Sequence, residues 1–427
     1  MYTIFLRLYY FATWIVSLWN PKAKSWIQGR KNLLQKIESI SIDSNDKVVW
    51  MHCASLGEFE QGRPVIERIK ADNPACKIIL TFFSPSGYEI RKNYAGANHV
   101  FYLPMDSRAN ARRIVNAFQP SLVLWVKYDY WYFYLRELQK RNIPALLLSA
   151  VFRPDQVFFK WYGKMYRKML VSFQQLFVQT TPSKELLAKI GITNNVMVSG
   201  DTRFDRVISI AEQAESIPVI EQFIGNNKTI VAGSTWEEDE EELDHYANTH
   251  PDIKFIIAPH EIDEDHLRDI ETLYHNRIRF SELEKQYRKG EVPEISKQSS
   301  FNRSSTFPNV LIIDNIGMLS QLYKYATIAY IGGGFGEDGV HNVLEAAVYG
   351  RPVIFGPVID KYQEAMDLVD SGGGIIIDSA LDAESVFDRL FVKEEEYRYC
   401  CEASRNYVYS KKGATEMIMR YIQEKRL

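Results

Sequence analysis

The sequence has few cysteines and no strong excess of charge of either sign. Its four cysteines, in 427 residues, form no CxxC pair, so they predict neither a disulfide framework nor a zinc site and fit a reduced, cytosolic setting. The formal net charge of −3 excludes a general polyanion-binding character, so we expect no nucleic-acid partner and only local anion sites. Charged residues at 25% and hydrophobic residues at 46% exclude a wholly disordered chain, and the length predicts two or three domains.

Only one apolar run is long enough to be considered for a membrane, and it lies at the N-terminus. Residues 2–19 are nearly all apolar or aromatic, with Arg7 as the one charge, and approach the ~20 residues that a spanning helix needs. No small-residue cleavage site comes after them, which disfavours a signal peptide. Residues 20–37 contain basic residues and no acid, a flank that favours a cytosolic location for the later domains and attracts anionic lipids. We expect residues 1–20 to be a membrane anchor or interfacial helix, the alternative being a buried first helix.

Short apolar runs alternate with longer helical patterns on both sides of a connector at residues 206–226. Continuous apolar strands between helices are typical of parallel sheets buried on both faces. The pattern therefore predicts an α/β chain of two doubly wound, parallel-sheet (Rossmann-like) domains facing a cleft, after an N-terminal hydrophobic helix. We expect domains at 21–210 and 225–400, and a C-terminal helix at 401–427 that could pack back on the first. A polar stretch at 296–309 predicts a long surface loop.

The loop after the first expected strand reads HCASLGEFEQG (52–62). Ser55 followed three residues later by Glu58 is a capping-box pattern, in which Glu58 is only a cap partner. Alternatively, a carboxylate at a strand end beside Gly57, where a substrate can approach closely, suits a general base. The local pattern favours the cap and does not separate Glu58 from Glu60, which is also an acid suited to a first helical turn.

Two further loops of the first half have polar groups at strand ends, where ligands of α/β sheets bind. The turn SPSG (84–87) can donate backbone and hydroxyl hydrogen bonds to a ligand. The segment VKYDYW (126–131) places Lys127 and Asp129 among aromatic residues. Such a mixture suits either a sugar or interdomain packing.

In the second half, AGSTWEEDEEE comes after a strand and opens an acidic helix. Most of this pattern is explained by a helix cap, with Ser234 or Thr235 as N-cap and Glu237 or Glu238 at the third helical position. The remaining acids predict a solvated helix face favoured by the helix dipole. Free N–H groups in the turn could still hold a phosphate. His260 also lies at an expected strand end, where a lone histidine is more often structural than functional.

The stretch YIGGGFGEDGVHNVLEAA (330–347) has the richest combination of groups. It is neither a Walker A loop nor a GxGxxG turn leading into a helix. We expect a helix to begin near His341 and Asn342 and to carry Glu345. A Gly-rich turn and a helix N-terminus supply N–H groups for phosphate, and the acid suits ribose hydroxyls; alternatively, Glu345 is an ordinary first-turn acid.

Taken together and in order, these loops resemble those of the Kdo (3-deoxy-D-manno-octulosonic acid) transferases of lipopolysaccharide assembly. The resemblance runs through nearly the whole chain, including the N-terminal apolar segment, and seven matches in order make it specific. They are ASLGE (54–58), SPSG (84–87), YLPMD (102–106), GDTRFD (200–205), GSTWEEDEE (233–241), DNIGML (314–319) and GVHNVLEAA (339–347).

The resemblance implies a GT-B glycosyltransferase that needs no metal or other cofactor. It implies transfer of Kdo from CMP-Kdo to a lipid A precursor at the cytoplasmic face of the cell inner membrane, with an acceptor-binding first domain and a nucleotide-sugar-binding second domain. Glu58, rather than Glu60, matches the family's proposed catalytic base for an inverting attack. The implied donor-binding residues are Arg203, Ser234, Thr235, His260, Gly332, Gly333, Gly334, Asn342 and Glu345. The implied acceptor-side residues are Ser55, Gly57, Ser84, Ser86 and Asp129.

Several positions depart from the family pattern. Lys127 stands where the family has Glu, and Val151 and Pro259 each replace an Arg. Trp236 replaces a His, while Arg203 replaces a Lys and offers a bidentate fork in place of a point charge. The regiochemistry of the family is therefore not carried over to this chain.

Two other functions remain open from sequence. One is another GT-B nucleotide-sugar enzyme, such as an N-acetylglucosamine transferase or a sugar-nucleotide 2-epimerase, which would need no membrane anchor. The other is a catalytically silent, membrane-bound relative. Lys127 in place of an acid supports the silent relative, whereas the presence of Glu58 and Glu345 argues against it.

Overall fold

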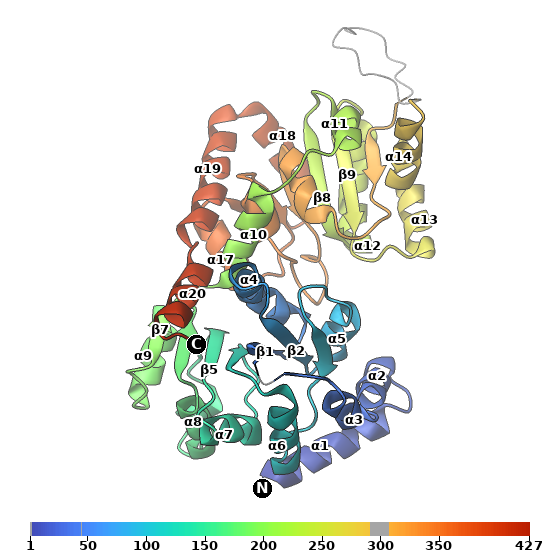
Figure 1. The fold of residues 1–427 in the computed structure, drawn as a ribbon. Helices are drawn as coiled ribbons and strands as arrows, with labels where there is room; N and C mark the ends of the chain where they lie inside the picture. Colours follow the sequence, from blue (N-terminus) through green and yellow to red (C-terminus); the bar gives the residue numbers. More distant parts are fainter. Residues whose placement is uncertain (1, 44, 291–306) are drawn as a thin grey trace. The chain divides into compact units, whose positions relative to one another are not determined.

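The computed structural model describes residues 2–43, 45–290 and 307–427 (Figure 1). Most of the surface loop expected at 296–309 lies outside the described residues. The chain divides into two compact units: Met1–Arg206 with Lys412–Leu427, and Val207–Lys411. The first unit therefore contains the last helix of the chain as well as its N-terminal half.

The first unit is built on a seven-stranded sheet in the order β3-β2-β1-β4-β5-β6-β7. Every pairing in it is parallel. Strands β1 to β3 extend the sheet in one direction and strands β4 to β7 extend it in the other. This reversal between β1 and β4 is the doubly wound arrangement expected from the sequence. The strands are β1 (Val48–Cys53), β2 (Lys77–Phe82), β3 (His99–Tyr102), β4 (Leu122–Val126), β5 (Ala145–Ala150), β6 (Gln175–Val178) and β7 (Val196–Val198).

Both faces of this sheet are buried under helices. Trp50 and Trp125 point into a core shared with α6 and α7, whereas Met51 and Leu124 point into a core shared with α4 and α20. This alternation along continuous apolar strands results from the two-residue period of a strand. The helices of the unit are α1 (Tyr2–Val16), α2 (Pro21–Gly29), α3 (Leu33–Glu38), α4 (Leu56–Asp72), α5 (Pro85–Arg91), α6 (Arg108–Phe118), α7 (Tyr132–Lys140), α8 (Lys164–Val171), α9 (Thr181–Lys189) and α20 (Ala414–Glu424).

The second unit repeats this architecture with another seven-stranded parallel sheet, in the order β10-β11-β9-β8-β12-β13-β14. Its strands are β8 (Thr229–Thr235), β9 (Lys254–Pro259), β10 (Arg277–Arg279), β11 (Val310–Ile312), β12 (Ile328–Ile331), β13 (Val353–Phe355) and β14 (Gly374–Ile376). Its helices are α11 (Pro218–Ile224), α12 (Glu237–Thr249), α13 (Glu264–Leu273), α14 (Phe280–Arg288), α15 (Leu319–Leu322), α16 (Leu344–Ala347), α17 (Gln363–Asp370), α18 (Ala380–Val392) and α19 (Glu394–Ser410). Helix α10 (Thr202–Glu212) spans the division between the units. The predicted fold class is confirmed.

The N-terminal helix α1 leaves most of its apolar side chains in solvent. Leu6 is its one buried residue. The alternative of a buried first helix is therefore wrong for the described residues. In the described part of the chain, no helix has both the length and the apolar character required to cross a membrane. The exposed apolar residues here are Ile4, Phe5, Leu8, Tyr9, Tyr10, Phe11, Trp14, Ile15, Val16, Leu18 and Trp19.

Polar contacts fasten this N-terminal region to the first sheet. The Tyr2 hydroxyl donates to Asp106 Oδ2 (2.6 Å), and the same carboxylate accepts the Phe133 N–H at the start of α7 (2.9 Å). The partly buried guanidinium of Arg30 donates to the carbonyl oxygens of Phe83 (2.7 Å) and Leu103 (3.1 Å), which come directly after β2 and β3. The helix is therefore held on the protein although its apolar residues face outward.

Candidate active site

Glu58 lies in the first turn of α4, directly after β1, and is 7% exposed. Its carboxylate accepts the backbone N–H of Ala54. The predicted capping box is wrong, because Ser55 is the N-cap but its side chain makes no capping hydrogen bond. Side chains of a helix point back toward its N-terminus, and the Glu58 carboxylate thereby reaches one residue beyond the N-cap.

Burial and a neighbouring charge set the protonation of Glu58. Desolvation, followed by the negative charge of Asp129, raises the pKa of Glu58 to about 7, against smaller opposing effects of the Ala54 N–H and the Lys127 charge. Glu60, by contrast, is in ion pairs with Arg91 (2.9 Å) and Arg63 (3.6 Å). A carboxyl that titrates near neutral pH suits acid–base chemistry, so the structure separates the two glutamates that the local capping pattern could not, in favour of the one that the family resemblance had indicated.

Asp129 is held in place beside Glu58 by hydrogen bonds. Its Oδ2 lies 3.2 Å from His52 Nε2 and 3.3 Å from Trp131 Nε1. Thr81 Oγ1 accepts from Trp50 Nε1 (2.8 Å) and lies 2.9 Å from His52 Nδ1. The imidazole of His52 thus bridges the Thr81 hydroxyl and the Asp129 carboxylate. His52 is fully buried inside β1, and nothing in the sequence distinguished it from an ordinary strand residue.

Cationic groups lie in the same region of the first unit. The charges of Glu58, Arg153 and Arg203 all act on the hydroxyl of Tyr128, whose pKa is raised chiefly by burial. Arg203 is fixed by Asp201, whose Oδ2 accepts from its Nε (2.9 Å) and Nη2 (2.8 Å). Arg203 is thus a candidate to meet an anionic substrate near the candidate base.

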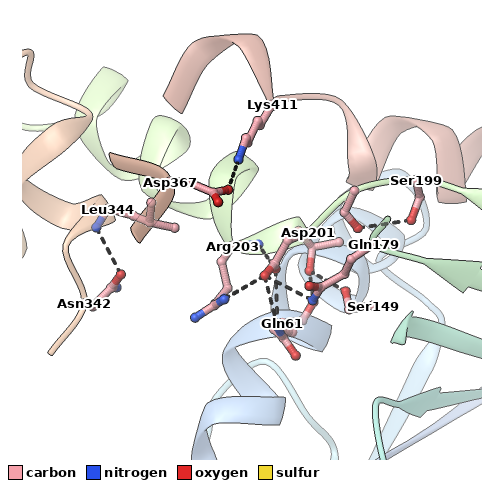
Figure 2. A network of polar contacts seen from close by, with 12 residues as sticks. Gln61, Ser149, Gln179, Ser199, Asp201, Arg203, Asn342, Leu344, Asp367 and Lys411 are labelled. Carbon is pink, nitrogen blue, oxygen red and sulfur yellow. Dashed lines mark hydrogen bonds and ion pairs between the residues drawn. The ribbon is translucent and has the colours of Figure 1, made fainter. Parts of the chain in front are cut away.

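Figure 2 shows how Asp201 itself is supported. Its carboxylate also accepts from the amides of Gln61 (3.2 Å) and Gln179 (3.1 Å). Gln61 is carried by α4, the helix that begins at the candidate base. The position of Arg203 is therefore tied to the helix that carries Glu58, a link that sequence spacing did not indicate.

The remaining acceptor-side predictions fall on two turns of the first unit. Ser84 is the N-cap of α5 and accepts the Ser86 N–H at 3.3 Å, while the two hydroxyl oxygens lie 2.9 Å apart. Gly57 is exposed, and a Cβ built on it would have no heavy atom within 4 Å. The space beside Gly57 is therefore open, next to a candidate base that is buried.

In the second unit, the predicted N-cap of α12 is wrong. The N-cap is Trp236, and the acid in the third helical position is Asp239, whose Oδ2 accepts the Trp236 N–H (3.0 Å). The Thr235 hydroxyl instead donates to Glu240 (2.7 Å). Ser234 has a φ of 54° at an irregularity of β8, which is an uncommon conformation for a residue other than glycine. Helix α12 therefore begins after Trp236, later in the chain than a cap at Ser234 or Thr235 would place it.

Asp239 joins the start of α12 to the Gly-rich turn after β12. The buried carboxylate accepts the Gly333 N–H at 2.8 Å and the Tyr330 hydroxyl at 2.7 Å, in addition to the Trp236 N–H. Burial raises its pKa. The acidic run predicted a solvated helix face, and for Asp239 this prediction is wrong.

The glycines of the turn serve close packing of the backbone. A Cβ on Gly332 would lie 2.3 Å from the Ser234 carbonyl oxygen, and one on Gly334 would lie 2.4 Å from the Gly356 nitrogen. The N–H groups of Gly332 and Gly333 are already bonded, to the Gly233 carbonyl (2.9 Å) and to Asp239. The turn therefore has fewer N–H groups for a phosphate than the sequence suggested.

The segment after this turn contains a shorter helix than expected. Helix α16 begins at Leu344 and has four residues, instead of beginning near His341. Asn342 Oδ1 accepts the Leu344 N–H (3.3 Å; Figure 2), while its Nδ2 donates to Glu345 Oε1 (2.9 Å). Asn342 and Glu345 thus lie together, as a donor–acceptor pair that could meet ribose hydroxyls.

The rings of Trp236, His260 and His341 form a stack in the second unit. Trp236 and His260 have centroids 4.6 Å apart, and His260 and His341 are 4.4 Å apart. His341 Nε2 accepts from Trp236 Nε1 (3.0 Å), and burial together with His260 lowers the pKa of His341 to about 4. His260 is therefore part of an aromatic cluster, a grouping that no local sequence signal indicated.

Comparison with known proteins shows what this chain is similar to. The sequence profile of the 3-deoxy-D-manno-octulosonic-acid transferase (Kdo transferase) family matches residues 29–206. A 3-deoxy-D-manno-octulosonic acid transferase of Chlamydophila psittaci is 25% identical over 344 residues, covering 78% of this chain and 74% of that protein. A bifunctional glycosyltransferase/methyltransferase of Fusobacterium nucleatum is 26% identical over 360 residues, covering 80% of this chain but only 52% of the relative.

Solved structures agree with the fold. The UDP-GlcNAc 2-epimerase of Neisseria meningitidis superimposes with a TM-score of 0.59 at 18% identity, covering 88% of this chain and 100% of that one. At this identity the likeness shows the shared two-domain α/β architecture alone. The chain is thus similar to the 3-deoxy-D-manno-octulosonic acid transferases, through a family profile over residues 29–206 and through relatives that align over most of its length, and it has a GT-B-like fold.

Proposed function

We propose that this protein transfers Kdo from CMP-Kdo to a lipid A precursor at the cytoplasmic face of the inner membrane. The observation that carries the proposal is Glu58, a buried carboxyl in the first turn of α4 whose pKa is raised to about 7, beside the open space at Gly57. In its ionised form it accepts the proton of an acceptor hydroxyl. That oxygen then attacks the anomeric carbon of Kdo while the bond to the CMP phosphate oxygen breaks, with inversion.

We assign the acceptor-binding groups to the first unit and most of the donor-binding groups to the second. Ser55, Ser84, Ser86 and Asp129 offer hydroxyls and a carboxylate around Glu58 for the acceptor sugar. In the second unit, Ser234, Thr235, the turn Gly332–Gly334 and His260 would hold the CMP moiety, with Asn342 and Glu345 at the ribose. Arg203 offers a guanidinium for the donor's phosphate or the carboxylate of Kdo, and an arginine fork can bind either in a bidentate manner.

The direct test is a transfer assay with the purified wild-type chain, CMP-Kdo and a lipid A precursor in detergent. We expect release of CMP and a product whose mass increases by whole Kdo residues. The same preparation is offered UDP-GlcNAc alone. Epimerisation of UDP-GlcNAc without any Kdo transfer would assign the chain to the sugar-nucleotide epimerases instead, and no reaction in either assay would favour the silent relative.

Gly57→Ala tests whether a substrate approaches the start of α4. The added methyl meets no protein atom within 4 Å, and alanine favours helix over glycine by up to about 1 kcal/mol. We therefore expect the melting temperature to be unchanged or slightly raised, while KM for the acceptor increases at least about tenfold, the equivalent of ~1.4 kcal/mol. Steady-state kinetics and thermal unfolding on the same preparation measure both. An unchanged KM would place the acceptor elsewhere.

The membrane location is proposed from α1, whose exposed face includes Leu8 (62%), Phe11 (57%) and Trp14 (47%). A contiguous apolar helix face with interfacial tryptophan is suited to lie in a bilayer surface. We expect Leu8→Ser/Phe11→Ser to weaken binding to uncharged phosphatidylcholine vesicles by more than about tenfold, since each side chain contributes ~1.5–3 kcal/mol on burial. Activity on a detergent-dispersed acceptor should persist. Vesicle co-sedimentation that is the same for both proteins would contradict this location.

A further inference from the structure

A cationic hollow of about 220 Å³ lies between α6 and α7 of the first unit, outside the candidate active site. Four of its six lining residues are basic. They come from two positions one turn apart on each helix, so their side chains converge on the same space. The lining residues are Arg108, Arg112, Phe133, Arg136, Glu137 and Lys140.

The charge of this hollow is not compensated within the described residues. Glu137, its one acid, is already paired with Arg141 at 2.7 Å on the same helix. The neighbouring Arg113 likewise has a partner, Glu38, at 2.5 Å. None of the four basic residues lining the hollow has a carboxylate within 4.0 Å among residues 2–43, 45–290 and 307–427, so about four positive charges face one small space.

The hollow adjoins the apolar N-terminal helix. The guanidinium of Arg108 lies 5.8 Å from the centroid of the Phe133 ring, and the ring of Tyr2, the first residue of α1, packs on Phe133 at 5.8 Å. Figure 1 shows α1 and α6 at the same end of this unit. An exposed apolar helix therefore lies beside a cluster of arginines that have no ion pair among the described residues.

We propose that this hollow binds the phosphate of an anionic phospholipid headgroup while α1 lies in the bilayer surface. Guanidinium groups bind phosphate oxygens in a bidentate manner. A bilayer presents such phosphates next to the apolar region that the α1 side chains would enter, which a free phosphate in solution does not. The inference rests on the membrane location proposed for α1, and it adds a lipid preference that α1 alone would not give.

The test compares Arg112→Gln/Arg136→Gln, one substitution on each side of the hollow, with a control that removes the same charge elsewhere. The control is Lys184→Gln/Lys189→Gln on α9, where both lysines are exposed and without an ion pair among the described residues. Binding to phosphatidylcholine vesicles with and without phosphatidylglycerol is measured by co-sedimentation at one ionic strength. Thermal unfolding checks that both variants are folded.

A basic residue at an anionic surface contributes roughly fivefold in affinity, so we expect the hollow variant to lose roughly thirtyfold on phosphatidylglycerol vesicles. Binding to pure phosphatidylcholine should not change, and the control should lose only a few-fold. Equal losses of affinity in the hollow variant and the control would mean that only the net charge matters, and would overturn the proposal. No loss of affinity in the hollow variant would overturn it as well. If inorganic phosphate stabilises the wild type but not the hollow variant, and vesicle binding is the same for both, the hollow is a free-phosphate site and the lipid assignment is wrong.

These results are distinguishable from a failure of the proposed function. If the α1 side chains do not bind the bilayer, affinity is low for both kinds of vesicle. If the hollow does not bind phosphate, affinity is low only for the anionic vesicles. Kdo transfer to a detergent-dispersed acceptor reports the chemistry separately from either surface. A wild-type chain that transfers Kdo but binds neither vesicle overturns the membrane location and this inference together, and leaves the transferase assignment standing.

Discussion

Glu58→Gln is expected to reduce Kdo transfer by on the order of 10²–10⁴-fold, because the variant has no group able to take the acceptor proton. The amide oxygen of glutamine can still accept the Ala54 N–H that the carboxylate accepts now. The start of α4 should therefore keep its conformation, and CMP affinity should be unchanged. Steady-state kinetics and calorimetric titration with CMP measure the two quantities on one preparation.

The pH dependence gives the same assignment a second, independent readout. With the pKa of Glu58 raised to about 7, kcat/KM of the wild type should increase about tenfold per pH unit below pH 7 and level off above it, since only the ionised carboxyl accepts a proton. The residual activity of Glu58→Gln should not show this increase. A wild-type profile that is flat between pH 5 and 8 would contradict a base with this pKa.

The stability of the variant should change in the opposite direction to its activity. The folded-state pKa of Glu58 is raised above its unfolded value of 4.5, so the folded protein holds this proton more tightly and loses stability as the pH rises from about 4.5 to 7. At 1.36 kcal/mol per unit, the ionised buried carboxyl costs about 3 kcal/mol above pH 7. Glu58→Gln should therefore be more stable than the wild type by up to about 3 kcal/mol at pH 8, and by little at pH 4.5.

Glu60→Gln is the matched control for these experiments. Glu60 lies two residues further along α4 and forms partly exposed ion pairs with Arg91 and Arg63. Such pairs contribute about 0–1 kcal/mol, and we expect transfer within about threefold of the wild type with no new pH dependence. If the Glu60 variant loses activity and the Glu58 variant does not, the two assignments must be exchanged.

Much of the fold could be predicted because parallel sheets leave a simple pattern in the sequence. Continuous apolar strands such as Val48–Cys53 and Leu122–Val126 are fully buried in the structure, as sheets covered on both faces require. The C-terminal helix was expected over 401–427 and able to pack back on the first domain, whereas the chain returns to the first unit only at α20, which contacts α4 and contributes Ile418 and Ile422 to the core beneath it. An amphipathic helix shows which of its faces is apolar but not which sheet that face covers.

The sites were predicted unevenly, for physical reasons. Glu58 was found through its motif, but its pKa is raised first by burial and then by Asp129, which is distant in sequence and fixed by His52. The N-cap of α12 was predicted at the wrong residue because Ser234 adopts a left-handed conformation. Such a conformation is uncommon for residues other than glycine and cannot be predicted from the residue type. Local rules fail most where the backbone is strained or where the partner of a group lies on another element.

Asp239 is the residue whose importance the sequence concealed most, and Asp239→Ala is expected to destabilise the protein by about 3–5 kcal/mol. Its carboxylate is 1% exposed and accepts from two backbone N–H groups and the Tyr330 hydroxyl. Alanine would leave these buried donors without an acceptor, and each such donor costs about 1–3 kcal/mol. The melting temperature and denaturant midpoint of the full chain measure this loss.

The same substitution should weaken CMP binding at least about tenfold at temperatures where the variant is folded, because the carboxylate links the start of α12 to Gly333 in the turn proposed to hold the donor. Asp239→Asn is the conservative partner: its Oδ1 can accept both N–H groups while its Nδ2 donates to Tyr330, whose hydroxyl oxygen can accept. It should retain most of the stability and most of the CMP affinity. Glu238→Gln, at the exposed neighbouring position of the same helix, should change stability by less than about 0.5 kcal/mol. If Asp239→Ala binds CMP as tightly as Asp239→Asn does, the carboxylate supports only the fold, and the donor is held by groups other than this turn.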